Sequence, residues 1–402
     1  MPSDEHLMDS AVSTPPRSLE HPLPAGMRDL LPAEAASRRA IARTCLDRFA
    51  LHGYALVTLP AFEFADVLER GLGALDPSDI IRFVEPESGE VAALRPDMTP
   101  QIARMIATRL RAMPPPLRLS YEGTVLRRRS GRAHKHRQIP QVGVELAGVS
   151  GPEGDLELLA VAADALRATG LERFAIDLGD AGIVRALLPD ATSEVAERVT
   201  AAVAKKDDVA LADAARDHSL PYVAELRELT RLQGDRAAIA EGLKLLRGTP
   251  ARAAVERLAA LFDAAAAGGL ASSLTADLGE VRGFSYYTGP IFHILARGPG
   301  ESIGSGGRYD DLLGRFGVPM PAAGFALDLD RLTLALRVAG VSAGRPRSVI
   351  VVGAPDDPRV AEWRGRGVTA VVCATRAMAF EYARAWGFTH VLDSDLVEVK
   401  GA

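Results

Sequence analysis

The chain has 402 residues, a length that predicts two or three domains. Hydrophobic residues make up 48% and charged residues 25%, as in an ordinary soluble globular protein, and the net charge of −5 excludes a nucleic-acid coat protein. Cys45 and Cys373 stand alone in apolar stretches, which excludes a disulfide framework and a cysteine-based zinc site and favours a cytoplasmic protein. No apolar run is long enough to span a membrane. Residues 1–22, rich in proline, serine and charge, are predicted to be a disordered tail.

The first half of the chain predicts alternating helices and strands. Apolar spacing indicates a helix over 33–52, and Pro60 marks a bend or an edge in the strand that follows. A second helix, over 99–112, is expected to begin with Thr99 as its N-cap. The other elements predicted here are a strand at 91–96, a hairpin with strands at 117–128 and 141–149, a helix at 155–170 and a strand at 173–179.

The second half of the chain changes twice in composition and predicted secondary structure. Residues 183–272 are rich in Ala, Leu, Arg and Glu with helical periodicity, which predicts an inserted helical subdomain. An aromatic, β-branched strand is then expected over 281–296, followed by a glycine-rich turn and short helix, and by a strand and helix over 322–340. After a linker, residues 347–402 alternate strand and helix, as in a small α/β unit.

The most unusual motif is RRRSGRAHKHR at 127–137, in which six of eleven residues are Lys or Arg. On a hairpin loop it would direct several cations at one anion, although a solvated loop is equally compatible with the pattern. Arg127 lies on the strand itself, so it is expected to point at whatever the sheet face holds. His134 and His136 lack acidic or cysteine partners and flank Lys135, so no metal site is expected there.

Other polar residues stand in or beside apolar strands, where a surface position or a satisfied core position is the simpler interpretation. The glycine-rich stretch at 304–310 lacks the phosphate-loop pattern, and its glycines more simply permit close approach of a ligand or a strand. The chain contains no HExxH motif and no Cys/His nucleophile pair.

Taken together, these stretches resemble the catalytic core of histidyl-tRNA synthetase, a class II synthetase, over about residues 22–340. GYALVTLPAFEFADVL, GTVLRRRSGRAHKHRQIPQVGVE and AAGFALDLDRL are similar to class II motifs 1, 2 and 3, and VRGFSYYTG and GSGGRYDDL to the two histidine-specific signatures. The resemblance implies an α+β fold over 23–340, with an antiparallel sheet flanked by helices and the helical insertion. It also implies that residues 347–402 are a truncated anticodon-binding domain.

The resemblance also assigns roles to matching positions. Asp97 and Thr99 would hold a substrate amino group, and Arg127 and Arg282 would act at the carboxylate. The histidine-binding residues that it implies are Asp97, Thr99, Arg127, Gln141, Glu145, Arg282, Tyr286, Tyr287 and Tyr309. A zwitterion with an imidazole needs this combination of an anion, a cation and hydrogen-bonding aromatic groups.

Departures from the synthetase pattern bear on function. Arg129 replaces a glutamate that helps to hold ATP, Asp328 replaces a small glycine beside the nucleotide, and Ser285 replaces an aspartate. The C-terminal stretch 347–402 is short and carries seven Lys or Arg and seven Asp or Glu, so tRNA binding is not expected.

LRPDMTPQIAR and GFALDLDRL resemble the regulatory subunits of ATP phosphoribosyltransferase. This resemblance implies a subunit without catalytic residues, metal or cofactor. Such a subunit is required for the activity of a short-form catalytic subunit in histidine biosynthesis and for feedback inhibition by L-histidine. It would assemble as a hetero-octamer built on a homodimer. Two alternatives stay open: a divergent histidyl-tRNA synthetase, favoured by the retained Arg127, Arg282 and Arg331, and a histidine-responsive module that acts on tRNA or a kinase through the basic loop.

Overall fold

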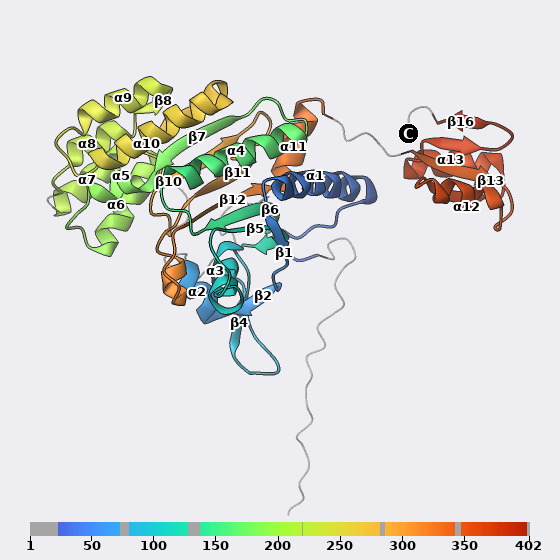
Figure 1. Cartoon of the computed structure of the whole chain (residues 1–402), viewed down its shortest axis with the longest axis horizontal. Helices are drawn as coiled ribbons and strands as arrows, with labels where there is room; N and C mark the ends of the chain where they lie inside the picture. Colours follow the sequence, from blue (N-terminus) through green and yellow to red (C-terminus); the bar gives the residue numbers. More distant parts are fainter. Residues whose placement is uncertain are drawn as a thin grey trace, which may run out of the picture.

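The computed structural model describes residues 23–72, 80–127, 137–218, 220–281, 286–341 and 347–399. Within them a large sheet has the strand order β1-β5-β6-β12-β11-β10-β7-β9-β8 (Figure 1). Its strands are β1 (Ala55–Val57), β5 (Leu117–Leu126), β6 (Gln138–Ala147), β7 (Ala175–Asp180), β8 (Gln233–Gly234), β9 (Leu274–Asp277), β10 (Pro290–Leu295), β11 (Gly304–Arg308) and β12 (Ala322–Asp328). Neighbouring strands are antiparallel except β1 with β5 and β7 with β9. The predicted antiparallel sheet is therefore confirmed in its middle and is mixed near both ends.

One face of this sheet is covered by helices. These are α1 (Pro32–Leu51), α4 (Pro152–Ala168) and α11 (Leu329–Val338), which lie together along the sheet in Figure 1. Successive side chains of a strand point to opposite faces, and in β6 Val142, Val144 and Leu146 belong to the large apolar cluster under these helices. The alternate residues of β6 are consequently directed to the opposite face.

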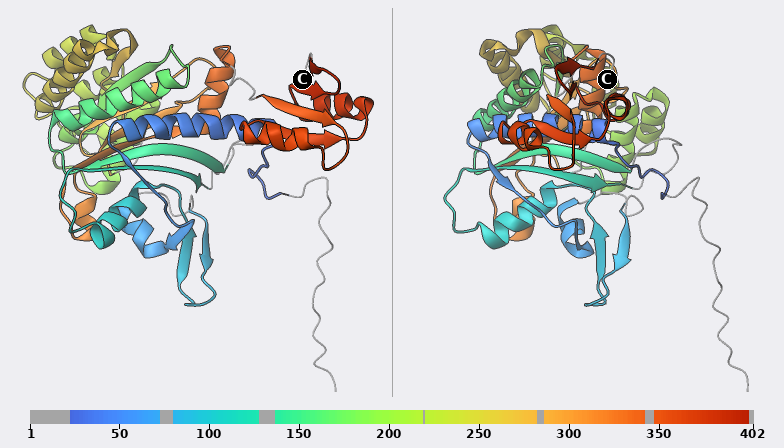
Figure 2. Two further views of the ribbon diagram at one scale, coloured as in Figure 1. Left: turned by 45° about the vertical axis from the view of Figure 1, so that its right-hand side comes forward. Right: turned by 90° about the vertical axis from the view of Figure 1, so that its right-hand side faces the viewer.

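The opposite face packs against α3 (Thr99–Arg109) and the short helix η4 (Leu313–Phe316), which share a second apolar cluster with β5. Beyond α3 lie α2 (Ala65–Leu72) and a small sheet with the order β2-β4-β3, formed by β2 (Phe62–Phe64), β3 (Arg82–Val84) and β4 (Val91–Leu94). Both views of Figure 2 place this small sheet on the side of the large sheet away from α1. The cavity described below opens on this face.

The helical insertion is α5 (Ala181–Ala186), α6 (Ser193–Lys205), α7 (Asp208–His218), α8 (Val223–Leu229), α9 (Arg236–Leu245) and α10 (Arg252–Ala265). Its apolar residues continue the large cluster on the helix-covered face of the sheet. Helical periodicity did not predict β8, which pairs with β9 and extends the edge of the sheet.

The C-terminal unit consists of β13 (Ser348–Val352), α12 (Pro358–Gly365), β14 (Thr369–Cys373), α13 (Arg376–Trp386), β15 (His390–Leu392) and β16 (Leu396–Glu398). Strand β13 is parallel to β14 and β15, and β16 is antiparallel to β15. The predicted alternation of strand and helix is confirmed, with β16 in addition. The two apolar clusters of the unit draw only on residues 349–399.

Three predicted elements are wrong in part. Of the strand expected over 281–296, the described residues form strand β10 from Pro290, and residues 286–289 follow an irregular path beside the cavity. The glycine-rich stretch expected to turn is strand β11, whose central glycines are required by neighbours: a Cβ at Gly306 would collide with Gly324 and Phe325 of β12. Tertiary packing therefore overrides the weak strand preference of glycine. The strand expected to follow the first helix, with a bend or an edge at Pro60, is two short strands, β1 and β2, on either side of Pro60.

Thr99 is the first residue of α3 and not its N-cap, which is Met98 without a side-chain cap bond. The Thr99 hydroxyl instead donates a hydrogen bond across to β6. The predicted tail at 1–22 lies outside the described residues. No helix among the described residues has the length and apolar character needed to cross a membrane.

Candidate functional site

A cavity opens on the α3 side of the sheet, over β6, β12 and β11. It encloses about 630 Å³ of space, part of it open to solvent, which is in the range of sites for small molecules. The polar and charged side chains that line it are Asp97, Thr99, Tyr121, Arg127, Gln141, Tyr286, Tyr287, Ser302, Ser305, Tyr309, Asp328 and Arg331.

Two carboxyl groups lie close to the start of α3. Tyr286 donates a hydrogen bond of 2.7 Å from its hydroxyl to Asp97 Oδ2, and the Thr99 amide donates one of 3.3 Å to Asp97 Oδ1. The Thr99 hydroxyl donates at 2.6 Å to Glu145 Oε1 on β6. Both carboxyl groups are buried, so an ammonium group placed beside the Asp97 carboxylate would meet weakly screened attraction.

Glu145 occupies a position that the alternation of β6 directs to the cavity face. Gly324, its partner residue on β12, provides the space, because a Cβ there would collide with the Glu145 carboxyl group. Burial, with a smaller effect of the nearby Asp97 charge, holds the pKa of Glu145 well above its usual range, although the Thr99 hydrogen bond opposes the shift. Glu145 is therefore a buried acid that favours its neutral form.

The cationic side of the cavity is formed by Arg127, directly after β5. Its Nε donates a hydrogen bond of 2.7 Å to the carbonyl of Pro96, which holds the guanidinium beside the residue that precedes Asp97. The cavity thus presents one anion and one cation from adjoining positions. That arrangement is suited to the ammonium and carboxylate of an amino acid.

Three tyrosines form the inner wall. Tyr286 lies with its ring centroid 5.1 Å from Tyr287 and 5.5 Å from Tyr309, and all three side chains are buried. Three buried polar atoms around the cavity have no hydrogen-bond partner among the described residues: Gln141 Oε1, Glu145 Oε2 and the Tyr309 hydroxyl. Buried polar atoms are ordinarily paired, so these atoms indicate that a polar ligand or water completes the site.

At the other end of the cavity, Asp328 and Arg331 line it as a charge pair. Asp328 Oδ1 accepts hydrogen bonds from the backbone amides of Asp330 and Arg331, and its Oδ2 lies 3.2 Å from Arg331 Nε. Arg331 also contacts the Glu301 carboxylate and donates a hydrogen bond of 2.8 Å to the Ser302 carbonyl. Burial raises the pKa of Asp328, and the backbone bonds and Arg331 oppose that shift. The aspartate therefore engages an arginine rather than standing as an isolated negative charge.

The structure brings the predicted residues together. Asp97, Thr99, Arg127, Gln141, Tyr286, Tyr287 and Tyr309 line the cavity, and Glu145 lies directly behind Thr99. Arg282 lies outside the described residues, as do Arg129, Ser285, His134 and His136. Sequence reasoning missed Tyr121. It lies two residues after Leu119 on β5, so strand alternation could have placed the two side chains on the same face. Sequence reasoning also missed Glu301 and Ser302, for which the sequence holds no signal. That these residues bind histidine stays a prediction.

A second polar group lies at the far end of the sheet. Carboxylate oxygens of Asp177, Asp277 and Glu280 lie within 4.8 Å of one another, a spacing compatible with a metal ion. The Lys206 ammonium is 3.0 Å from Asp277, and Thr275 donates a hydrogen bond to Asp177. Protein groups therefore already balance part of this charge.

Comparison with known proteins agrees with this fold. The family model for histidyl-tRNA synthetase matches residues 26–332. A solved structure from Bacillus halodurans, described as an ATP phosphoribosyltransferase regulatory subunit/histidyl-tRNA synthetase, superposes with a TM-score of 0.79 at 28% identity, over 92% of this chain and 97% of that one. Histidyl-tRNA synthetase from Nostoc superposes with a TM-score of 0.73 at 21% identity, over 92% of this chain and 90% of that one, and shows the fold alone. The fold and the family match together define a protein of the class II histidyl-tRNA synthetase type.

Curated relatives narrow the family. The ATP phosphoribosyltransferase regulatory subunit of Geobacter sulfurreducens is 37% identical, over 94% of this chain and 90% of its own length. The regulatory subunit of Anaeromyxobacter sp. strain Fw109-5 is 44% identical. The match spans 82% of this chain and 96% of that relative, which is therefore the shorter protein. The chain belongs to the family of ATP phosphoribosyltransferase regulatory subunits.

Proposed function

We propose that this chain is a non-catalytic subunit that activates a short-form ATP phosphoribosyltransferase catalytic subunit in the cytoplasm and conveys feedback inhibition by L-histidine. It would act in a hetero-octamer built on its own homodimer, without a metal or other cofactor. The observation that carries the ligand assignment is the pairing of Asp97 and Arg127 in one cavity lined by tyrosines and unpartnered buried atoms.

The ligand would bind with its ammonium group at Asp97 and its carboxylate at Arg127. Its imidazole would then lie among the tyrosines, within reach of the unpartnered Gln141, Glu145 and Tyr309 atoms. A ring nitrogen without a proton accepts a hydrogen bond and one with a proton donates. Because its pKa is raised, Glu145 can keep a proton on Oε2 and donate it to the ring.

The charge pairing at the other end of the cavity supports a regulatory rather than a catalytic role. A nucleotide phosphate would have to separate Arg331 from Asp328 and Glu301, and the freed carboxylates would then face the phosphate. Breaking partly buried charge pairs of this kind is costly. The names of the relatives also favour this function over a divergent synthetase.

Feedback requires a difference in affinity between two states. Histidine can lower the activity of the complex only if it binds the less active conformation more tightly than the active one. Closure of the tyrosine wall and Arg127 around the ligand is a local change that a subunit interface could amplify.

The direct experiment adds the purified chain to the short-form catalytic subunit from the same source and follows phosphoribosyl-ATP formation with and without histidine. We expect activation by the chain and inhibition by histidine. Absence of activation would contradict the regulatory function, and histidine-dependent ATP–pyrophosphate exchange would then establish a synthetase.

The site is tested separately by calorimetry with histidine. Arg127→Ala should weaken binding by about 30-fold or more, because it leaves the ligand carboxylate buried without its cation. Arg198→Ala, at an exposed position on α6, is the matched control and should bind normally. Normal affinity and normal feedback in Arg127→Ala would show that histidine binds elsewhere.

A further inference from the structure

The backbone that carries Tyr287 is held by the helical insertion. Arg185 of α5 donates a hydrogen bond of 2.6 Å from Nη2 to the Tyr287 carbonyl, and the Ala181 amide donates one of 3.0 Å to the Gly289 carbonyl. The segment 286–289 lacks regular secondary structure. These bonds from α5 therefore help to set the position of a tyrosine that lines the cavity.

Helix α5 stands between the two apolar clusters of the core. Ala181, at its start, packs against the cluster that contains Tyr286, Tyr287 and Tyr309. Ile183 and Val184 belong to the other cluster, together with the apolar residues of the insertion. A small movement of α5 would consequently change the packing in both clusters.

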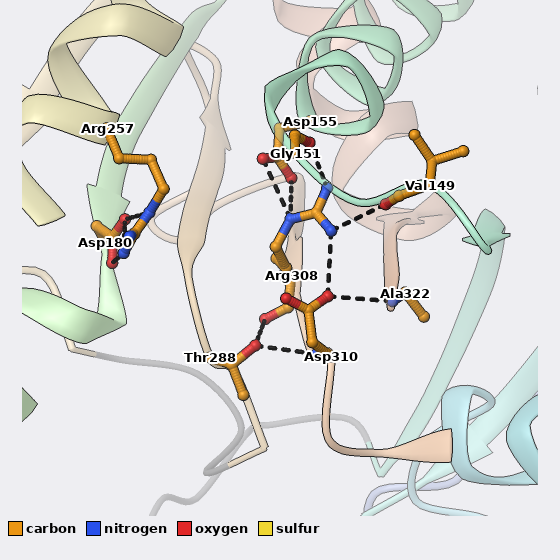
Figure 3. A network of polar contacts seen from close by, with 9 residues as sticks. All are labelled: Val149, Gly151, Asp155, Asp180, Arg257, Thr288, Arg308, Asp310 and Ala322. Atoms are coloured by element: carbon orange, nitrogen blue, oxygen red, sulfur yellow. Dashed lines mark hydrogen bonds and ion pairs between the residues drawn. The ribbon is translucent and has the colours of Figure 1, made fainter. Parts of the chain in front are cut away.

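An ion pair between a buried carboxylate and a partly exposed arginine fixes the start of α5. Asp180 is the N-cap of this helix, with its Oδ1 accepting a hydrogen bond of 2.8 Å from the Gly182 amide. Arg257 of α10 approaches the same carboxylate with two donors, Nε at 2.9 Å and Nη2 at 2.9 Å, as Figure 3 shows. The Asp180 side chain is fully buried. Such a two-point contact orients a carboxylate strongly.

We propose that Arg185, Asp180 and Arg257 are positioning residues for the cavity. Arg257 orients Asp180, Asp180 holds α5, and α5 places the Tyr287 backbone through Arg185. Occupation of the cavity is thereby linked to the helical insertion. The inference rests on the proposed binding of histidine and adds a route by which the insertion responds to it.

The test measures histidine affinity in paired variants of the full chain. Arg185 is exposed, so Arg185→Met should change the melting temperature little while weakening binding by about three- to tenfold, as expected for the loss of one hydrogen bond. Arg185→Lys keeps a donor and should recover part of the affinity.

The ion pair has a matched control in the insertion. Arg236 contacts Asp263 with the same two-donor geometry, at 2.7 and 3.0 Å, and no residue of this pair lines the cavity. Arg257→Gln should weaken histidine binding, and Arg236→Gln should not. If Arg257→Gln fails to fold, the Arg185 variants decide the question alone.

Hydrogen exchange supplies a second readout, one that a purely structural role would not change. With histidine at saturation, amides of α5 and α10 should exchange more slowly in the wild-type chain, and Arg185→Met should lose this protection. Wild-type affinity and full protection in Arg185→Met would overturn the positioning role. Absence of histidine binding by the wild-type chain would overturn the proposed function instead.

Discussion

Two buried polar clusters lie on opposite faces of the sheet at the end of β11. They differ in how many of their polar atoms have hydrogen-bond partners. Arg308 points away from the cavity, where Nε contacts both oxygens of Asp155, Nη1 reaches the Val149 carbonyl and Asp310, and Nη2 reaches the Gly151 carbonyl (Figure 3). The next residue along the chain, Tyr309, lines the cavity, and its buried hydroxyl has no partner among the described residues.

This contrast distinguishes polar groups that stabilise the fold from polar groups that are available to a ligand. A cluster in which every guanidinium nitrogen of Arg308 has an acceptor in the protein joins β11 to the start of α4. The cavity keeps unpartnered oxygens on Gln141 and Glu145 as well as on Tyr309, and such atoms cost stability unless a ligand or water satisfies them. Substitutions in the first cluster should therefore change folding, and those in the second should change binding.

The largest effect is expected for Arg308→Met, which leaves the buried Asp155 carboxylate without its cation. We expect a loss of about 3–5 kcal/mol in the free energy of unfolding, measured with urea. The exposed pair of Arg236 and Asp263 is the control, and Arg236→Met should cost no more than about 1 kcal/mol. Equal costs in both variants would show that burial of Arg308 contributes nothing to its role.

The contribution of Asp155 to the free energy of unfolding should depend on pH. Burial raises its pKa to about 6 from 3.8, although Arg308 opposes the shift. Between about pH 4 and pH 6 the folded chain then binds more protons than the unfolded chain, so the stability contributed by Asp155 falls as pH rises through this window. Asp155→Asn should therefore cost more at pH 4.5 than at pH 7.5, by at most about 3 kcal/mol. The reverse order would mean that attraction to Arg308 exceeds the cost of burial.

A smaller and opposite pattern is expected for Tyr309→Phe. Because the hydroxyl has no partner among the described residues, its removal should leave the free energy of unfolding unchanged or slightly raised. Histidine affinity should fall by about two- to tenfold, as for the loss of one hydrogen bond. Calorimetry and urea unfolding of the same variant decide the matter, and a loss of stability without a loss of affinity would refute a binding role.

The smallest effect is expected when residues 342–402 are removed. The apolar clusters of the C-terminal unit share no residue with those of the core, and shorter relatives carry the same family name. The melting temperature of the core and its histidine affinity should be unchanged. A drop in either would show that the C-terminal unit supports the cavity.

Much of the cavity was predictable because its residues sit in ordered motifs. The alternation of Gln141, Gly143 and Glu145 with valines on β6 places both polar side chains on one face, and two-residue periodicity is a local property of the chain. The same local logic identified the hairpin and the C-terminal alternation. It failed for β11, because only the neighbouring strands show why glycines are needed there.

The amino-acid sequence by itself determined the helices, most of the strands, the set of residues that resemble a histidine site and the replacement of a glycine by Asp328. Only the tertiary structure decided that Asp328 and Glu301 contact Arg331. It also decided that the Thr99 hydroxyl donates to Glu145 instead of capping its helix, and that α5 holds the Tyr287 backbone. The reason is physical. Periodicity and propensity act over a few residues, whereas all of these contacts except the one between Asp328 and Arg331 join groups that lie far apart in the chain. Burial of the groups then determines which charges and hydrogen bonds form.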